Sequence, residues 1–313
     1  MTGLLVMAYG SPRGLADLEA YYTHIRGGRR PSPELLEELA GRYRAIGGRS
    51  PLPEITERQA RALETRLNAG GAGPYRAYIG MKHAAPFIAD AVAAMAADGV
   101  TEGVGVVLAP HYSRMSVGTY IGTAEVARRR LPAPFPMRYV ERWGEHPAFV
   151  EALAASLRAA LAALPDDERP RAASIFTAHS LPETILAWGD PYPDELRRTS
   201  AAVAARAGVT AWRFAFQSAG RTPDPWLGPD VGEVIAELGA AGVPAVAVCP
   251  VGFVADHLEV LYDLEIEARA QAGRLGMRFV RAASLNDHPL LIDALADVVL
   301  HQAVEPVTGL SAH

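Results

Sequence analysis

The chain has 313 residues, of which half are hydrophobic and 21% are charged, with a formal net charge of −5 at pH 7. This length suits one large domain or two of ordinary size, and the negative charge argues against a general nucleic-acid-binding protein. The only cysteine, Cys249, excludes an internal disulfide and a cysteine-ligated iron–sulfur cluster, and its apolar surroundings predict a buried thiol.

The sequence contains no recognisable export or membrane segment. Residues 1–10 have too short an apolar run, and no basic region, for a signal peptide. No apolar stretch reaches the ~18 residues of a membrane span. We therefore expect a cytoplasmic protein without stable membrane association.

Short apolar segments alternate with longer segments of helical periodicity. Strands are predicted at residues 3–9, 75–81, 103–109, 137–143, 173–179, 212–218, 245–251 and 277–283. Helices are predicted between them, for example at residues 53–68, 85–98, 146–163 and 194–207. Continuous hydrophobicity is typical of buried parallel strands, and their alternation with helices predicts an α/β protein with parallel sheets.

Arginines are concentrated in the segment 21–52, before the second predicted strand. They are Arg26, Arg29, Arg30, Arg42, Arg44 and Arg49. Guanidinium groups suit carboxylates or phosphates, although a solvated basic face explains the cluster equally well. Further along, the segment 109–120 adds Tyr120 and other polar and aromatic residues to the end of a predicted strand.

Four predicted strands in each half indicate an internal duplication. The first strand of the first half ends in AYGSP and that of the second half in AHSLP, which makes Tyr9 and His179 equivalent. We expect two similar Rossmann-like domains, residues 1–143 and 144–285, each with a four-stranded parallel sheet flanked by helices. Residues 286–313 would form a C-terminal helix and tail that pack back on the first domain. Because ligands of such sheets bind at the carboxyl ends of the strands, Tyr9 and His179 would face each other across a cleft between the domains.

Three residues follow strand ends in the second half. His179 ends one predicted strand, Trp226 lies in the turn-rich segment 217–230, and Glu259 follows the strand at 245–251. They should therefore converge on one edge of the sheet. A lone histidine is more often structural than catalytic, and Trp226 fits a hydrophobic plug as well as the wall of a site for a flat ligand.

The segment DHLEVLYDLEIE, residues 256–267, places Glu259, Asp263 and Glu267 four residues apart, on one stripe of a predicted helix. Like charges at this spacing destabilise a helix by roughly 0.2–0.5 kcal/mol per pair, and no lysine or arginine is interleaved to relieve them. An α-helix would put Glu267 about 12 Å from Glu259. A solvated acidic face explains the stripe, and so does a path for a divalent cation.

Imidazole with carboxylate suits a borderline metal such as Fe²⁺, whereas the absence of a phosphate-binding glycine motif disfavours a nucleotide enzyme.

Several segments together resemble the ferrochelatase family. IFTAHSLPETILAWGDPY, FQSAGRTPDPWLGPD and PVGFVADHLEVLYDLEIE are similar to its motifs, and GLLVMAYGSP and YIGMKHAAPFI to its shorter soluble members from monoderm bacteria. The resemblance runs from about residue 3 to 300. It implies a chelatase-type fold and an enzyme that inserts Fe²⁺ into coproporphyrin III in haem biosynthesis. It also implies a monomer without a permanently bound cofactor, with iron and porphyrin as substrates.

The resemblance also implies roles for individual residues. His179 and Glu259 would be the catalytic iron-binding pair, and Tyr9 an axial ligand of the product iron. With these roles assigned, our hypothesis for the acidic stripe is that Asp263 and Glu267 form an outer metal path. Porphyrin contacts are expected from Tyr9, Arg26, Arg42, Tyr43, Ser50, Tyr120 and Trp226. Where the family often has a second arginine after Arg26, this chain has Gly27, with Arg29 or Arg30 as candidate substitutes.

Three points stay open at this stage. The sequence does not divide the roles of metal ligand and proton acceptor between His179 and Glu259. A chelatase of the same fold could act on protoporphyrin IX with iron, or on sirohydrochlorin with cobalt or nickel. A non-catalytic porphyrin or haem carrier would keep the arginines and Tyr9, but would not need His179 together with Glu259.

Overall fold

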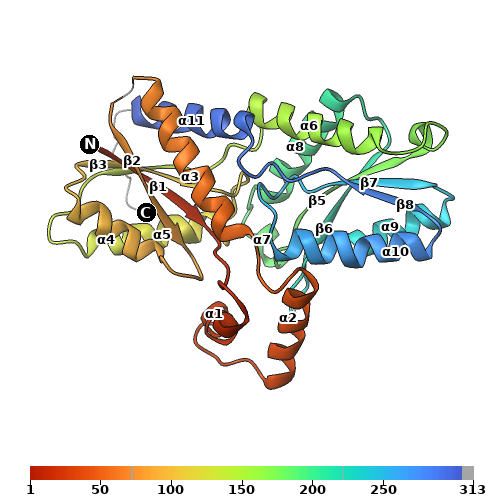
Figure 1. The fold of residues 1–313 in the computed structure, drawn as a ribbon, viewed down its shortest axis with the longest axis horizontal. Helices are drawn as coiled ribbons and strands as arrows, with labels where there is room; N and C mark the ends of the chain where they lie inside the picture. The colour runs from red at the N-terminus through yellow and green to blue at the C-terminus, as the bar shows by residue number, and fades with distance from the viewer. Residues whose placement is uncertain (72, 221, 305–313) are drawn as a thin grey trace.

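The computed structural model describes residues 1–71, 73–220 and 222–304, and it contains two four-stranded parallel sheets (Figure 1). The first, in spatial order, is β2 (Tyr75–Met81), β1 (Thr2–Ala8), β3 (Glu102–Val107) and β4 (Met137–Val140). The second is β6 (Trp212–Gln217), β5 (Ala173–His179), β7 (Ala245–Cys249) and β8 (Arg278–Arg281). The two orders are equivalent, so the predicted α/β class and the pair of similar sheets are confirmed, and no strand end lies more than three residues from its predicted position.

The central strand of each sheet is buried on both faces, as its continuous apolar run predicts. In β5 every residue is buried until His179, the last one. Helices cover the sheets on both sides. They are α3 (Leu52–Ala69), α4 (Ile88–Ala97), α5 (Val117–Arg129), α6 (Pro147–Ala162), α8 (Tyr192–Ala207) and α9 (Val231–Ala240). Gly80 in β2 lets α4 approach closely, since a Cβ there would lie 2.9 Å from the Cα of Ile88.

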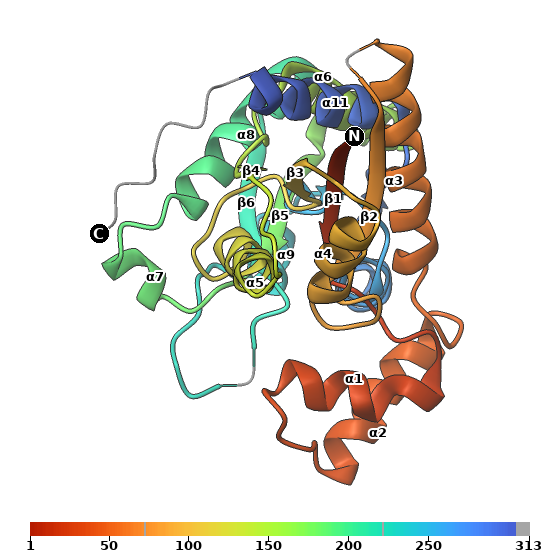
Figure 2. The same ribbon diagram turned by 90° about the vertical axis from the view of Figure 1, so that its left-hand side faces the viewer.

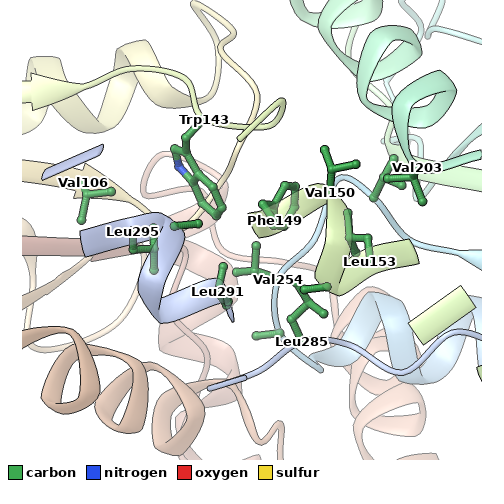
Figure 3. Close-up of a cluster of buried hydrophobic side chains, with 14 of the residues drawn as sticks. Val106, Trp143, Phe149, Val150, Leu153, Val203, Val254, Leu285, Leu291 and Leu295 are labelled. Carbon is green, nitrogen blue, oxygen red and sulfur yellow. The ribbon is translucent and has the colours of Figure 1, made fainter. Parts of the chain in front are cut away.

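One hydrophobic core joins the two sheets. It extends from Val106 of β3 through Trp143 and Phe149 to Val203 of α8 (Figure 3). Helix α11 (Pro289–Val304) packs against α3, β3 and β4, and also against α6. The two sheet units are therefore held in a shared core. Of the C-terminal helix and tail predicted at 286–313, residues 305–313 lie outside the described residues.

Two helices project from the body of the molecule between β1 and α3 (Figures 1 and 2). They are α1 (Leu18–Ile25) and α2 (Pro33–Ala45). Ser32 caps α2 by accepting a hydrogen bond from the backbone of Leu35 at 3.3 Å. A small separate core holds the pair together, and Leu258 of the second half packs against it. Most of the arginine-rich segment thus belongs to an excursion that touches both halves.

The acidic segment is a π-helix, η3 (Glu259–Ala268), which continues into α10 (Arg269–Arg274). At its end the backbone N–H of Arg269 reaches the carbonyl of Leu264, five residues earlier. The prediction of an α-helix was therefore wrong in type, and the rise of 1.5 Å per residue does not apply to this stripe. Within the described ranges no helix is long and apolar enough to cross a membrane.

Candidate metal centre and porphyrin site

His179 ends β5 with about a third of its side chain accessible. Its Nδ1 lies against the backbone carbonyl of Ser180 and must donate to it, because a carbonyl oxygen only accepts. Its Nε2 faces Oε1 of Glu259 at 3.4 Å. The ring orientation is thus fixed through Nδ1, which leaves Nε2 as the nitrogen for a proton or a metal.

Close packing of the loop after β7 brings Glu259 to this position. The backbone N–H of Gly252 donates to the carbonyl of Thr177 at 3.1 Å. A Cβ at Gly252 would lie 2.5 Å from the Cβ of Ala178, so a larger residue would push the loop away from β5. The structure therefore has His179 and Glu259 at the same edge of the second sheet, as we inferred from the strand order.

The two side chains shift each other's ionisation. Burial opposes a charge on His179, but the Glu259 carboxylate outweighs it and raises the pKa of the imidazole to about 9. Burial likewise opposes ionisation of Glu259, yet His179 and then His257 hold the pKa of this carboxyl well below its usual range. Near neutral pH the pair is therefore an imidazolium facing a carboxylate, with a proton on Nε2 as well as on Nδ1.

His257 is a neighbour of the pair that the sequence reasoning missed. Its Nε2 lies 3.6 Å from Oε2 of Glu259, and its Nδ1 faces the carbonyl of Ala255 at 3.0 Å. The signal was present in the segment DHLE, where His257 precedes Glu259 by two residues. The carboxylate of Glu259 thus lies between two imidazoles.

The middle acid of the stripe is neither solvated nor unpaired. Asp263 is 7% exposed, forms an ion pair with Arg42 of α2, and accepts a hydrogen bond from the hydroxyl of Ser218. Burial outweighs Arg42 and, with the charge of Glu259, raises the pKa of Asp263 to about 6. No basic residue is interleaved in the stripe, but Arg42, 221 residues away in sequence, supplies a countercharge to Asp263. Glu267, the third acid, is exposed.

Tyr9 follows β1, as His179 ends β5, and 43% of it is exposed. Its ring packs against His83, with the ring centroids 4.6 Å apart. Desolvation and the charge of Glu259 both raise the pKa of its phenol. Tyr9 and Glu259 therefore share one electrostatic environment, although they come from different halves of the chain.

The other predicted porphyrin contacts differ in accessibility. Tyr43, Ser50 and Tyr120 are buried. The Tyr43 hydroxyl lies 3.1 Å from that of Ser11, and Ser50 Oγ accepts from the backbone of Leu52 at 3.3 Å. The ammonium of Lys82, the only lysine in the chain, lies 5.1 Å from the ring centroid of Tyr120.

Trp226 is partly buried, and its ring centroid is 6.4 Å from that of His179. Its indole N–H donates to Thr222 at 2.9 Å, and its backbone forms a bridge to Pro182. It is therefore held beside His179 rather than within the core.

The arginines of the α1–α2 excursion fall into two groups. Arg30, Arg44 and Arg49 are paired with the neighbouring carboxylates of Glu19, Glu37 and Glu54. In the parts of the chain that the structure covers, Arg26 and Arg29 have no carboxylate partner. Gly27 and Gly28 have positive φ and turn the chain back, so that Nε of Arg29 donates to the carbonyl of Arg26 at 3.3 Å. These two guanidinium groups come from the same turn.

In residues 1–71, 73–220 and 222–304, no group of three or more His, Cys, Asp or Glu side chains is placed to hold a metal ion. A cavity of about 250 Å³ between the halves is lined by His111, Glu195 and Thr199 among others, but not by His179 or Glu259.

Two parallel sheets of equivalent order, with an imidazole–carboxylate pair at one sheet edge, define a two-domain chelatase-type protein. The solved structure "SirB from Bacillus subtilis with Fe3+" superposes with a TM-score of 0.58 at 16% identity, covering 97% of this chain and 96% of that one. A cobalt complex of the sirohydrochlorin chelatase SirB from Bacillus subtilis subspecies spizizenii gives a TM-score of 0.56 at 14% identity, with the same coverage. These likenesses concern the fold.

The chain belongs to the ferrochelatase family, which it matches over residues 1–303. It is 50% identical to the coproporphyrin III ferrochelatase of Geobacillus kaustophilus, over 97% of this chain and 96% of that protein. It is 49% identical to the protein of the same name from Bacillus subtilis, over 95% and 96%. It is 43% identical to the ferrochelatase of Herpetosiphon aurantiacus, over 96% and 99%. The protein is therefore an enzyme whose substrates are a porphyrin and a metal ion.

Proposed function

We propose that this enzyme inserts Fe²⁺ into coproporphyrin III during haem biosynthesis. The observation that carries the proposal is the His179–Glu259 pair at the carboxyl edge of the second sheet, with Nε2 and Oε1 3.4 Å apart. The names of the relatives at about 50% identity support this choice of porphyrin.

The pair has two tasks in this reaction. A metal-free porphyrin carries two pyrrole N–H protons, both of which must leave, and the incoming iron must exchange water for porphyrin nitrogens. Ligands bind a metal only when deprotonated, so iron that approaches Glu259 displaces the proton from Nε2 of His179. As the metal passes from the pair to the porphyrin nitrogens, Nε2 of His179 can take up one pyrrole proton and the carboxylate of Glu259 the other, and both protons then leave to water.

The opposite wall would hold the ring. Arg26 is the proposed partner of one propionate, and Arg42 would contact another with the guanidinium N–H groups that its ion pair with Asp263 leaves over. Tyr43, Ser50, Tyr120 and Trp226 are the other proposed porphyrin contacts. Tyr9 would become the axial ligand of the product iron, on the face away from His179. Asp263 and Glu267 would attract the hydrated ion before it reaches Glu259.

Further features complete the proposal. The enzyme would act as a monomer in the cytoplasm, without stable membrane association and without a resident cofactor.

The deciding experiment compares porphyrins under anaerobic conditions. Purified enzyme is given Fe²⁺ with coproporphyrin III, with protoporphyrin IX, or with sirohydrochlorin, and insertion is followed by absorption. We expect the highest kcat/KM with coproporphyrin III. Preferential turnover of protoporphyrin IX would contradict the proposed substrate, and porphyrin binding without any insertion would point to a carrier.

Arg29, rather than Arg30, should supply the second propionate contact beside Arg26. Arg29→Ala is expected to weaken coproporphyrin III binding about fivefold, the usual size of an exposed charge interaction. Arg30→Ala should leave binding unchanged, because Arg30 is already paired with Glu19 at 2.6 Å. Fluorescence titration with metal-free porphyrin measures both, and the reverse order of effects would exclude Arg29.

A further inference from the structure

Gln217 is a buried polar residue beside the metal centre that the mechanism so far does not use. It is the last residue of β6 and pairs in register with His179 of β5. Its side chain is fully buried, and its Nε2 donates a hydrogen bond to the backbone carbonyl of Glu259 at 3.2 Å. It therefore connects the strand beside His179 with the residue that faces His179.

The other end of the same amide has no hydrogen-bond partner among the residues described. A buried acceptor without a partner costs about 1–3 kcal/mol. A methionine would fill a similar volume without that cost. The presence of an amide here is thus best explained by the hydrogen bond that its N–H group donates to the Glu259 carbonyl.

The next residue holds the following turn of η3. Ser218 has a φ of 59°, in the left-handed region that serine seldom occupies, and its hydroxyl donates to Asp263. Two consecutive residues after β6 therefore contact η3 at Glu259 and at Asp263. The first turn of η3 needs such support, because its N-cap, Leu258, makes no side-chain capping bond.

We propose that Gln217 is a positioning residue for metal insertion. Its hydrogen bond to the Glu259 carbonyl fixes the first turn of η3 against the edge of the sheet, and so keeps the Glu259 carboxylate in front of Nε2 of His179. The expected effect of Gln217 on the rate of insertion rests on the proposed function. Its expected effect on metal affinity does not.

A matched pair of variants tests the role. Gln217→Met removes the donor and keeps the volume. Gln59→Met is the control, because Gln59 is also buried, donates to a backbone carbonyl (Asn286, 2.6 Å) and has an unpartnered Oε1, but does not contact the pair. Both variants should lower Tm by similar amounts, since each loses one buried hydrogen bond.

Only Gln217→Met should change the chemistry. We expect its kcat for iron insertion to fall about tenfold or more, since misplacement of a catalytic group by ~1 Å can cost ~100-fold. The KM for porphyrin should stay at the wild-type value. In a calorimetric titration with Zn²⁺, its Kd should rise about tenfold, and His179→Ala identifies the heat that belongs to this site.

The outcomes separate the two proposals. If wild-type enzyme inserts iron and Gln217→Met matches Gln59→Met in kcat and Zn²⁺ affinity, Gln217 has only a structural role. If wild-type enzyme does not insert iron, the proposed function fails, and the Zn²⁺ titration still decides the role of Gln217. Should Gln217→Met fail to fold, Gln217→Leu also removes the donor without burying a charge, with the same results expected.

Discussion

Replacement of His179 by alanine is expected to abolish iron insertion and to leave porphyrin affinity almost unchanged. Nε2 of His179 is the only ring nitrogen free to bind the metal or accept a proton, because Nδ1 is occupied by the Ser180 carbonyl. Loss of a general acid–base group alone costs about 100- to 10,000-fold in rate. The porphyrin, in contrast, would be held mainly by the arginines of the α1–α2 excursion, which this substitution does not touch.

Two measurements on the same preparation check this expectation. Steady-state insertion of Fe²⁺ reports the chemistry, and a fluorescence titration with metal-free coproporphyrin III reports binding. His257→Ala is the matched control, since it removes an imidazole 3.6 Å from the other oxygen of Glu259. We expect His257→Ala to lower the rate less than His179→Ala does. Insertion near the wild-type rate in His179→Ala would remove this residue from the mechanism.

Those parts of the site that follow from strand order could be read from the sequence. Parallel strands end at one edge, so His179 after β5 and Glu259 after β7 had to lie near each other once the strands were identified. The equivalence of Tyr9 and His179 followed from the short repeat AYGSP and AHSLP. In each case a local pattern was combined with a general rule of sheet topology.

What could not be read depended on contacts between distant segments or on small differences in helix geometry. Nothing in the spacing of Asp263 indicates that Arg42, from a separate helix pair, neutralises it. Acids four residues apart fit a helical turn of either the α or the π type, so the pattern did not distinguish them. The hydrogen bond from Gln217 to Glu259 was likewise hidden, because a glutamine at a strand end carries no periodic signal.

Substitutions in the acidic stripe should produce the second large change in insertion rate. Glu259→Gln should lower the maximal rate by about 100-fold or more, and added iron should not restore it, because the substitution removes the carboxylate that faces Nε2 of His179. Glu267→Gln should instead raise the iron concentration needed for half-maximal rate and leave the maximum nearly unchanged, since Glu267 is exposed and lies two turns further along η3.

Asp263→Asn tests two roles of one residue, in attracting iron and in holding Arg42. Asp263 lies between the two glutamates, but it also binds Arg42, which is itself only partly exposed. Its loss should raise the iron requirement as in Glu267→Gln. It should also weaken porphyrin binding, because Arg42 would lose the partner that anchors α2 to η3. Iron-dependence curves at fixed coproporphyrin III, and porphyrin titrations of all three variants, distinguish these effects. Wild-type iron dependence in Glu267→Gln would mean that the stripe guides no metal beyond Asp263 and that its outer end is only a solvated helix face.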